Sequence, residues 1–486
     1  MSCIRILLFR FVFTICCIPL LVILALSCNH DLLDPDPDAL PGFSTDTVSF
    51  DTVFTTIGSA TLYFKVYNKD NRPLLIRSIE LAGGANSFFR LNIDGEPASG
   101  VTNVEIAPKD SMFIFVAVTI DPLNSNNPVI VSDSVVFNTN GTLQHVKLLA
   151  YGQDVHLFKD TFIGTETWIN DKPYLIFGNL EVDSGHVLTI EPGTQIYFHR
   201  NSSMVVWGTL FVNGTGGNQV VFQNDRLETF YDIVPGQWGT IFFAPYSRGN
   251  RINHAIIRNS IAGLQLGFPG DPRVPELEIS NSIIQNMSFA GIYAFGADLL
   301  CYNTVIANSA GPAVALLQGG NYEFYHCTIS NNGVVGTSRS SPSLVMTNFF
   351  DNIEEGAYVR YTRDFTAGFV NSIIYGSNLH ELQLLNSPVS QFNYSFDHCL
   401  LKASEDSIDF DNEEIFSKII LNRDPNFVND SDRYHLNYSL DTLSPAKDSG
   451  DFQLLQSFPY LEYDIMEHSR NFDGKPDLGA FERKED

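Results

Sequence analysis

The sequence predicts an all-β protein in which a β-sandwich precedes a right-handed parallel β-helix of roughly ten turns. Residues 45–153 contain short β-branched and aromatic runs between turn clusters. Residues 160–440 contain a repeat of 22 to 27 residues without a helical pattern. Charged residues make up 17 % of the chain and aromatic residues 12 %, a balance that favours strands over helices.

Residues 1–27 have the organisation of a secretion signal. Two arginines precede the apolar stretch 11–26, and the small residues Ala25 and Ser27 stand before Cys28. The alternative is an uncleaved anchor, because about 20 apolar residues can cross a bilayer. The segment "ALSC" resembles the lipobox of bacterial lipoproteins, although Leu is usual where Ala25 stands. The resemblance implies that Cys28 is lipidated and holds the mature chain at a membrane.

Residues 28–44, which include "NHDLLDPDPDALPG", are acidic and interrupted by proline, so we expect an extended, solvated tether. An acidic run directly after the lipidated Cys resembles the surface-export signal of Bacteroidetes lipoproteins. This resemblance implies a location at the outer membrane, with the chain facing the cell exterior or the periplasm. The net charge of -26 excludes a nucleic-acid partner, because a nucleic-acid binder shows a basic face.

Residues 45–153 predict about seven short strands, among them "TLYFKVYN", "MFIFVAVTI" and "HVKLLAYG". The alternation of Phe113 and Phe115 with Met112 and Ile114 is weak, because both sets are apolar. Weak alternation is typical of strands covered on both faces. The segment resembles the immunoglobulin-like modules that precede catalytic or binding domains in Bacteroidetes surface proteins, although the Cys…Trp…Cys pattern of antibody domains is absent.

The repeat in residues 160–440 aligns on a polar residue followed by a small one. The aligned segments are "INHAIIRN", "ISNSIIQN", "CYNTVIAN", "FYHCTISN", "FVNSIIYG" and "FDHCLLKA". They share an aliphatic column: Ile257, Ile284, Ile306, Ile329, Ile374 and Leu401. The separations in this column are 27, 22, 23, 45 and 27 residues. Because 45 is about two periods, we expect one degenerate turn around "SLVMTNFFDNIEEGAYV".

This period fits a parallel β-helix, in which three short strands per turn stack on the next turn at about 4.8 Å. The aliphatic column then fills the core. The polar residue lies at the bend between two strands, where Asn tolerates left-handed backbone geometry. The polar column is His254, Asn281, Asn303, His326, Asn371 and His398.

Two further segments extend this interpretation. "LTIEPGTQIYFHRNSSMVVWGTLFVNGTGGNQVVFQND" and "PGQWGTIFF" resemble common bacterial β-helix repeats, which implies that the solenoid begins near residue 175. Residues 441–486, with "SPAKDSGD" and "DIMEHSRNFDGKPDLGAFE", resemble the closing segment of extracellular bacterial β-helix proteins. Because a solenoid needs a polar cap over its last turn, we expect Asp464, Arg470 and Asp477 to tie that cap down.

Two His-Cys steps, "YHC" at 325–327 and "DHC" at 397–399, contain the residue types of a nucleophilic or metal site. The repeat favours a structural role, since each His falls in the polar column and each Cys in the small-residue column. With a degenerate turn between them, Cys327 and Cys399 lie about three turns apart, roughly 14 Å, which is beyond disulfide reach.

The catalytic alternative is a polysaccharide lyase, which needs a Lys or Arg base and usually Ca²⁺. Residues 175–440 hold two lysines, and Lys402 directly follows a core strand, so it is the candidate base. The paired-Asp motifs of β-helix glycan hydrolases are absent from the solenoid sequence. A run of acids, with Asp409, Asp411 and Glu413 as Ca²⁺ candidates, favours a solvated loop because it lacks the Gly of an EF-hand.

The sequence therefore favours a lipid-anchored, non-catalytic protein that binds or adheres to polysaccharide through the β-helix. Aromatic residues that could stack on sugars are Trp207, Tyr231, Trp238, Tyr293 and Tyr325, although the repeat places Trp207 and Trp238 inside the coil. The alternatives are a glycan-degrading enzyme and a structural envelope component. Apart from Ca²⁺, no cofactor is indicated, and the sequence leaves the ligand and oligomeric state open.

Overall fold

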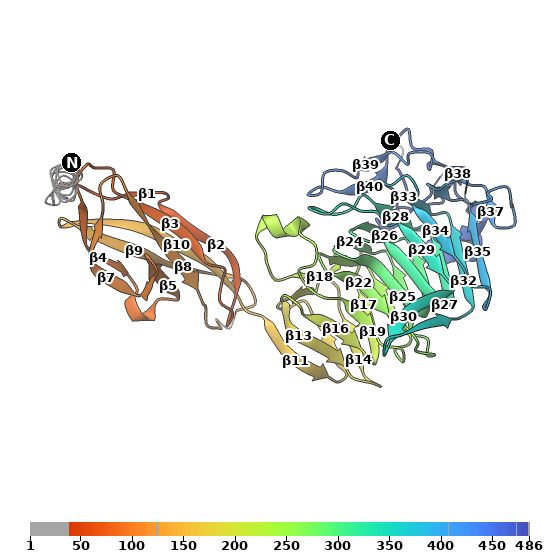
Figure 1. The fold of residues 1–486 in the computed structure, drawn as a ribbon, viewed down its shortest axis with the longest axis horizontal. Coiled ribbons are helices and arrows are strands. Elements are labelled where there is room, and N and C mark those ends of the chain that lie inside the picture. Colours follow the sequence, from red (N-terminus) through yellow and green to blue (C-terminus); the bar gives the residue numbers. More distant parts are fainter. Residues whose placement is uncertain (1–37, 123–124, 407, 473, 485–486) are drawn as a thin grey trace, which may run out of the picture. The chain divides into compact units, whose positions relative to one another are not determined.

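The computed structural model describes residues 38–122, 125–406, 408–472 and 474–484. The predicted signal sequence, Cys28 and most of the tether lie outside the described residues. Its described part divides into two compact units, residues 38–122 with 128–152 and residues 125–127 with 153–484 (Figure 1). The prediction of an all-β fold is confirmed. Among the described residues, no helix is both long and apolar enough to span a membrane.

The first unit, called here the sandwich unit, consists of two five-stranded sheets around one core. The first sheet has the order β1 (Gly42–Phe43), β3 (Leu62–Tyr67), β8 (Ser111–Val118), β5 (Phe89–Ile93) and β6 (Glu96–Ala98). The second has the order β2 (Thr47–Phe54), β10 (Thr142–Gln153), β9 (Val129–Thr139), β4 (Leu74–Leu81) and β7 (Gly100–Ile106). The 3-10 turn η1 (Gly84–Asn86) precedes β5.

The strand β8 shows where the sequence prediction for this unit fails. Met112, Ile114 and Val116 point into the core, whereas Phe113 and Phe115 are each 37 % exposed. The weak alternation of apolar residues therefore does not come from burial on both faces. It comes from aromatic side chains on the outer face of the sheet.

The second unit, the β-helix unit, winds strands into three parallel ladders, called sheets A, B and C. Sheet B stacks ten rungs, which agrees with the number of turns predicted. Two strands near the beginning, β11 (His156–Ile163) and β13 (Tyr174–Val182), contribute to both sheet C and sheet A. Two longer strands, β25 (Ala290–Tyr302) and β27 (Val314–Tyr325), continue from sheet A into sheet B.

The other strands belong to one ladder each. Sheet A adds β16 (Ser203–Val206), β19 (Ile241–Phe243), β22 (Ala262–Leu266), β29 (Leu344–Thr347) and β34 (Leu382–Leu385). Sheet B adds β12 (Glu166–Trp168), β14 (Val187–Ile190), β17 (Thr209–Asn213), β20 (Asn250–Asn253), β23 (Glu276–Ser280), β32 (Phe365–Val370), β35 (Phe392–Asp397) and β37 (Phe416–Ser417). Sheet C adds β15 (Gln195–Phe198), β18 (Val220–Asn224), β21 (Ala255–Arg258), β24 (Ile283–Met287), β26 (Val305–Ser309), β28 (Thr328–Asn331), β33 (Ile373–Gly376), β36 (Leu400–Leu401) and β38 (Ile420–Leu421).

The aliphatic column of the repeat is a single register line in sheet C. Each residue pairs with the next in the order Ile257, Ile284, Ile306, Ile329, Ile374 and Leu401, and all are fully buried. The polar column lies one bend earlier, and every member has a positive φ between 47° and 52°. Its members are His254, Asn281, Asn303, His326, Asn371 and His398.

The predicted degenerate turn is wrong, since Ile329 pairs directly with Ile374. The 45 residues between them form one turn enlarged by insertions. One insertion is the antiparallel hairpin of β30 (Phe349–Glu354) and β31 (Ala357–Thr362). Cys327 and Cys399 consequently lie two turns apart, because only the rung containing β33 separates theirs.

The C-terminal segment lies along the side of the solenoid and not over its last turn. Tyr438, Ile465 and Ala480 pack on Val305 and Ala307, which face outward from sheet C. The hairpin of β39 (Phe427–Asn429) and β40 (Asn437–Leu440) belongs to this segment, as do α2 (Phe452–Ser457) and η3 (Pro459–Leu461). Figure 1 shows β39 and β40 beside β26, β28 and β33.

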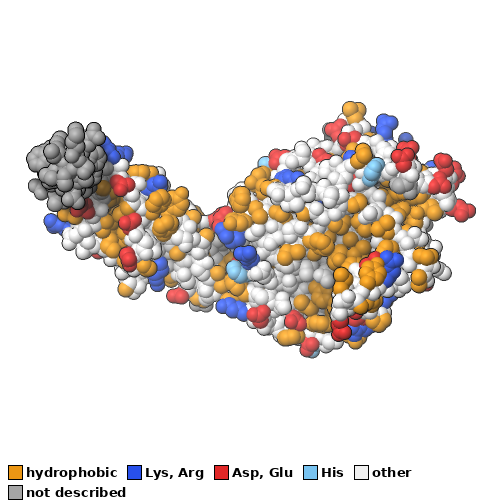
Figure 2. Space-filling model, viewed as in Figure 1, with side chains coloured by type: hydrophobic (Ala, Val, Ile, Leu, Met, Phe, Trp, Pro, Cys, Tyr) orange, Lys and Arg blue, Asp and Glu red, His pale blue; other side chains and the backbone are white. Residues whose placement is uncertain are grey.

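The open end of the core is covered by the acidic loop that follows β36. Ile408, Phe410 and Ile415 pack against the core, and the ring centroids of Phe410 and Phe416 are 4.7 Å apart. Asp409, Asp411 and Glu413 point outward and are exposed. Figure 2 shows acidic side chains gathered at this end of the β-helix unit. The loop is therefore the cap, with alternating apolar and acidic residues.

The positive φ of the polar column predicts a specific ranking of substitutions at Asn281. Both Asn281→Ala and Asn281→Gly remove the hydrogen bonds to Asn253 and Asn303. Only alanine also carries a Cβ into left-handed geometry, which costs about 1–2 kcal/mol. We expect calorimetry to show a lower free energy of unfolding of the β-helix unit for N281A than for N281G. Equal stability of the two variants would contradict this origin of the bend.

Candidate functional site

The sequence "SFDHCLL" divides its chemical groups between two environments. His398 lies at a bend, where its Nδ1 is 2.9 Å from Asp397 Oδ1. The Cys399 thiol lies in the core, where it donates to the carbonyls of Asp397 and Phe369, and burial raises its pKa to about 12. A thiol held neutral in this way is a poor nucleophile. The two side chains do not form a catalytic pair.

The other two core cysteines lie next to each other, which the sequence analysis missed. The sulfur atoms of Cys301 and Cys327 are 3.6 Å apart, and both residues are fully buried as free thiols. Cys301 belongs to the column of inward apolar residues and Cys327 to the column of small residues. Only the three-dimensional spacing of these columns brings their side chains together.

His326 is the most enclosed member of the polar column. Its Nε2 is 3.0 Å from the side-chain nitrogen of Asn371, and its ring is fully buried. Burial, together with the nearby Arg470 guanidinium, lowers the pKa of His326 well below its usual value. The ring is therefore neutral at physiological pH and links neighbouring rungs.

One constellation of three candidate metal ligands forms where the C-terminal segment meets this column. Ligand atoms of Asp397, His398 and Asp451 lie within 4.8 Å of one another, and no other such group occurs among the described residues. Asp451 also caps α2 by accepting from Gln453 N at 2.9 Å. Because Asp451 lies 54 positions from Asp397, no local motif could have revealed it. The predicted Ca²⁺ candidates Asp409, Asp411 and Glu413 do not converge in this way.

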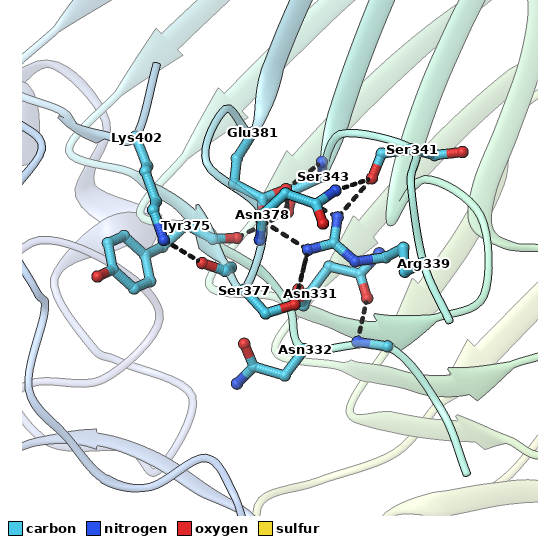
Figure 3. A network of polar contacts seen from close by, with 12 residues as sticks. Asn331, Asn332, Arg339, Ser341, Ser343, Tyr375, Ser377, Asn378, Glu381 and Lys402 are labelled. Atoms are coloured by element: carbon cyan, nitrogen blue, oxygen red, sulfur yellow. Dashed lines mark hydrogen bonds and ion pairs between the residues drawn. The ribbon is translucent and has the colours of Figure 1, made fainter. Parts of the chain in front are cut away.

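The candidate base Lys402 is held by local contacts. Its Nζ donates to Gly376 O at 2.7 Å and lies 4.6 Å from the centroid of the Tyr375 ring. Figure 3 shows the side chain directed at this carbonyl and ring. A cation that is engaged in this way anchors one turn to the next. The structure thus gives Lys402 a packing role.

Next to Lys402 lies a buried ion pair that the sequence analysis did not find. Arg339, in the loop after β28, forms a bidentate pair with Glu381 at 2.6 and 2.8 Å. Glu381 also accepts from Ser343 and from the backbone of Asn378 (Figure 3). The two side chains are 2 % and 0 % exposed. This network fixes an inserted loop onto the solenoid.

The predicted C-terminal residues form a second buried network, on the side of the solenoid. Asp464 accepts from the backbone of Met466, His468 and Glu482. The same segment is also bonded to the polar column. The Arg470 guanidinium donates a hydrogen bond to Asn303 Oδ1 at 3.1 Å.

Arg470 and Asp477 are also buried. Asp477 accepts from the backbone of Asp448 and Arg483. Burial lowers the pKa of Arg470 and raises that of Asp477. This network fastens the C-terminal segment to the solenoid.

The aromatic candidates have different surroundings. Trp238 is buried against Phe198, with ring centroids 4.1 Å apart, as the repeat predicts. Trp207 is only half-buried and donates to Glu181 at 2.7 Å, so it does not fill the coil interior. Tyr231 lies beneath the Arg226 guanidinium, and Tyr325 contacts Phe458 of the C-terminal segment.

Tyr293 belongs to an aromatic surface on the outer face of sheet A. Phe242, Gln265 and Tyr293 are register neighbours on successive rungs. Phe268 lies 5.9 Å from Phe242, and Phe289 lies 5.0 Å from Tyr293 (ring centroids). Phe242, Phe268, Phe289 and Tyr293 are called here the sheet A patch. Figure 2 shows hydrophobic side chains on the visible face of this unit.

The remaining faces of the solenoid differ from sheet A. The outer face of sheet C is covered by the C-terminal segment. Sheet B presents charged and polar residues, such as Arg251 and Glu278, which form an ion pair of 3.4 Å. Its outward apolar residues Tyr302, Tyr325 and Val370 pack against α2 and η3. The sheet A patch is partly open, with Phe268 37 % and Phe289 41 % exposed. It is the apolar surface of the solenoid best placed to meet a ligand.

Comparison with known proteins supports the fold. Residues 272–408 match the family described as "Right handed beta helix region". No curated protein matches the sequence.

Solved structures give only distant likenesses. A Vibrio cholerae protease, VesB, is 12 % identical over 23 % of this chain and 31 % of its own, with a TM-score of 0.17. A Porphyromonas gingivalis W83 protein of unknown function is 9 % identical over 26 % of this chain and 60 % of its own, also with a TM-score of 0.17. The catalytic domain of a GH87 α-1,3-glucanase is 10 % identical over 70 % of this chain and 82 % of its own, with a TM-score of 0.16. The first two alignments span less than two thirds of those chains, and TM-scores this low say nothing about function.

The buried state of His326 predicts a pH-dependent stability. Because its pKa is lower in the folded than in the unfolded chain, the unfolded state binds more protons below about pH 6.5. Stability then falls with decreasing pH, by at most about 1.4 kcal/mol per pH unit, until the folded pKa is reached. We expect His326→Asn to flatten this fall in calorimetric melts, since Asn fills the same column elsewhere. The exposed His380→Asn variant should keep the wild-type profile, and an unchanged profile for H326N would contradict the prediction.

The Arg339–Glu381 pair predicts non-additive substitutions. Glu381→Gln leaves a buried guanidinium without its counter-charge, so we expect it to lower the free energy of unfolding by about 3–5 kcal/mol. The double variant R339M/E381Q should lose less than the sum of the two single changes. Urea denaturation gives the free energies of unfolding of E381Q, R339M and R339M/E381Q. Glu276→Gln, in a more exposed pair with Arg248, is the control, with an expected loss below about 1 kcal/mol.

Proposed function

We propose that this protein is a non-catalytic glycan-binding or adhesion protein, held at the outer membrane by a lipid on Cys28. The observation that supports it is the sheet A patch. Phe242 and Tyr293 lie on strands of an in-register sheet, and Phe268 and Phe289 adjoin the ends of β22 and β25, so Phe242 and Tyr293 lose little conformational freedom when a ligand stacks on them. Aromatic faces suit the apolar faces of pyranose rings.

The surroundings of the patch favour a sugar over a purely apolar ligand. Gln265 lies between Phe242 and Tyr293 on the register line, and its amide can bond a hydroxyl group. At the adjoining corner the Arg273 guanidinium stacks on Tyr246, 3.6 Å from the ring centroid. Rings interleaved with fixed polar groups match a ligand that has both apolar faces and hydroxyl edges.

The surroundings of the catalytic candidates support binding in preference to turnover. Lys402 is engaged by Gly376 and Tyr375, and the Cys399 thiol is buried. A lyase would require Lys402 to leave these contacts before it could accept a proton. A role as a structural envelope component accounts for the buried networks but gives no reason for the open rings of the sheet A patch.

Removal of two rings from the patch should weaken glycan binding. We expect the double variant Phe289→Ala/Tyr293→Ala to bind its best ligand on a glycan array of host and plant polysaccharides about tenfold more weakly. Tyr434→Ala, which removes an exposed ring from the C-terminal segment, is the matched control and should bind like the wild type. Melting curves of each variant establish that the fold is retained.

Two outcomes would overturn the proposal. The first is that no polysaccharide is retained by the wild-type protein on the array or in affinity gels. The second is turnover: new ultraviolet absorbance of unsaturated uronate in the presence of Ca²⁺, lost in Lys402→Ala, would show that the protein is a lyase.

A further inference from the structure

The sandwich unit carries an exposed aromatic surface that the sequence analysis did not anticipate. Tyr63 is 58 % exposed, and Phe113 and Phe115 are each 37 % exposed. Tyr63 pairs with Phe115, and Lys65 pairs with Phe113, across β3 and β8. Directly paired residues lie on the same face of a sheet, so these side chains share the outer face.

The three rings form one continuous cluster. The centroid of the Tyr63 ring is 5.4 Å from Phe113 and 6.0 Å from Phe115. The rings of Phe113 and Phe115 are 5.9 Å apart, with an interplanar angle of 14°. Three adjoining rings on one face of a sheet form a platform on which sugar rings can stack.

Two cations accompany the rings. Lys65 Nζ lies 4.6 Å from the centroid of Phe113. Arg90 stands beside Ala117 on the next strand and is exposed, and one of its terminal nitrogens, Nη1, bonds the carbonyls of Ser87 and Phe89. Among the described residues, no acidic side chain pairs with either cation. We call Tyr63, Lys65, Arg90, Phe113 and Phe115 the sandwich platform.

The chain has 55 acidic and 29 basic residues, so the two cations beside these rings form a local positive surface in a protein of net negative charge. A positive surface surrounded by net negative charge complements an anion that must approach closely. Salt screens the long-range repulsion beyond about 8 Å, so the local cations dominate at contact.

The platform borders a hollow large enough for part of a sugar chain. Beside Phe115 a hollow of about 370 Å³ is lined by Thr61, Arg90, Asn92 and Ala117, among others. Its lining combines a guanidinium, an amide and a hydroxyl with an aromatic edge. Those groups can hold a carboxylate and neighbouring hydroxyls while a pyranose ring stacks on Phe115.

We propose that the sandwich platform binds an acidic glycan, with uronate rings stacked on Tyr63 and Phe115 and their carboxylates paired with Arg90 and Lys65. This second binding face is separate from the sheet A patch and does not depend on it. A carboxylate fits because it is planar and can accept two parallel bonds from a guanidinium.

The test uses residues 38–486, which contain both described units, and titrates a galacturonate oligosaccharide by calorimetry. Its fully methyl-esterified form is the matched neutral probe. We expect the acid to bind at least about tenfold more tightly than the ester, with the difference decreasing as salt rises. K65Q/R90Q should remove this difference without altering the rings.

The ring variant Y63T/F115T should weaken binding of both probes at least about tenfold. Threonine keeps the strand preference of these positions. Phe162→Thr removes a similarly exposed ring from the β-helix unit and should bind like the wild type. If Y63T/F115T has a lower melting temperature than the wild type, the affinities of K65Q/R90Q for the two probes and the salt dependence of wild-type binding still test the proposal.

The proposal is overturned if acid and ester bind equally, or if Y63T/F115T binds like the wild type. It is also overturned if light scattering shows a dimer that Y63T/F115T abolishes, because the platform would then be a contact between copies. The same titration with F289A/Y293A separates the two proposals. If only F289A/Y293A loses affinity for the oligosaccharide, the binding site is the sheet A patch. If only Y63T/F115T loses affinity, the binding site is the sandwich platform.

Discussion

The β-helix unit depends on one repeated backbone conformation, the left-handed bend between sheets B and C. At six successive positions, from His254 to His398, a non-glycine residue has φ near +50°. That geometry is unfavourable for most side chains, and Asn adopts it most readily. Each bend directs the next residue into the core and brings the aliphatic column into register. On these rungs only one or two residues separate the strand of sheet B from that of sheet C, whereas the earlier connections β14–β15 and β17–β18 use longer loops.

The bends also bond to one another and to the C-terminal segment. Asn303 donates to Asn281 and to Tyr463 O, and Asn371 bonds His326 and both backbone groups of Asp451. The column therefore serves as the attachment line for a segment 80 to 160 residues away in sequence. This attachment explains why Arg470 is buried on the side of the solenoid and not over its end.

The distribution of chemical groups follows from this arrangement. Of the histidines and cysteines that resemble a catalytic set, Cys327, Cys399 and His326 are buried, and burial raises the pKa of the Cys399 thiol and lowers that of the His326 ring. His398 lies at a bend, where it is paired with Asp397. Charged groups that are buried, such as Arg339 with Glu381, hold insertions in place. What faces outward on sheet A of the solenoid and on one sheet of the sandwich unit is aromatic. In both units the surfaces that suit a ligand are therefore sheet faces with open rings.

The sequence by itself determined the fold, the register and the inward columns, because a period of 22 to 27 residues constrains every rung in the same way. It also predicted that "SFDHCLL" contributes one rung of the ladder. It failed where an insertion has the length of a turn, as with the hairpin of β30 and β31.

Only the tertiary structure decided which residues from distant segments meet. Asp451 beside Asp397, Arg339 with Glu381, and the sulfur atoms of Cys301 and Cys327 share no local pattern. The open faces were also decided at this level, since Phe113 and Phe115 have the composition of a covered strand. Whether a ring is buried depends on what packs over its sheet, and that is a property of the whole fold.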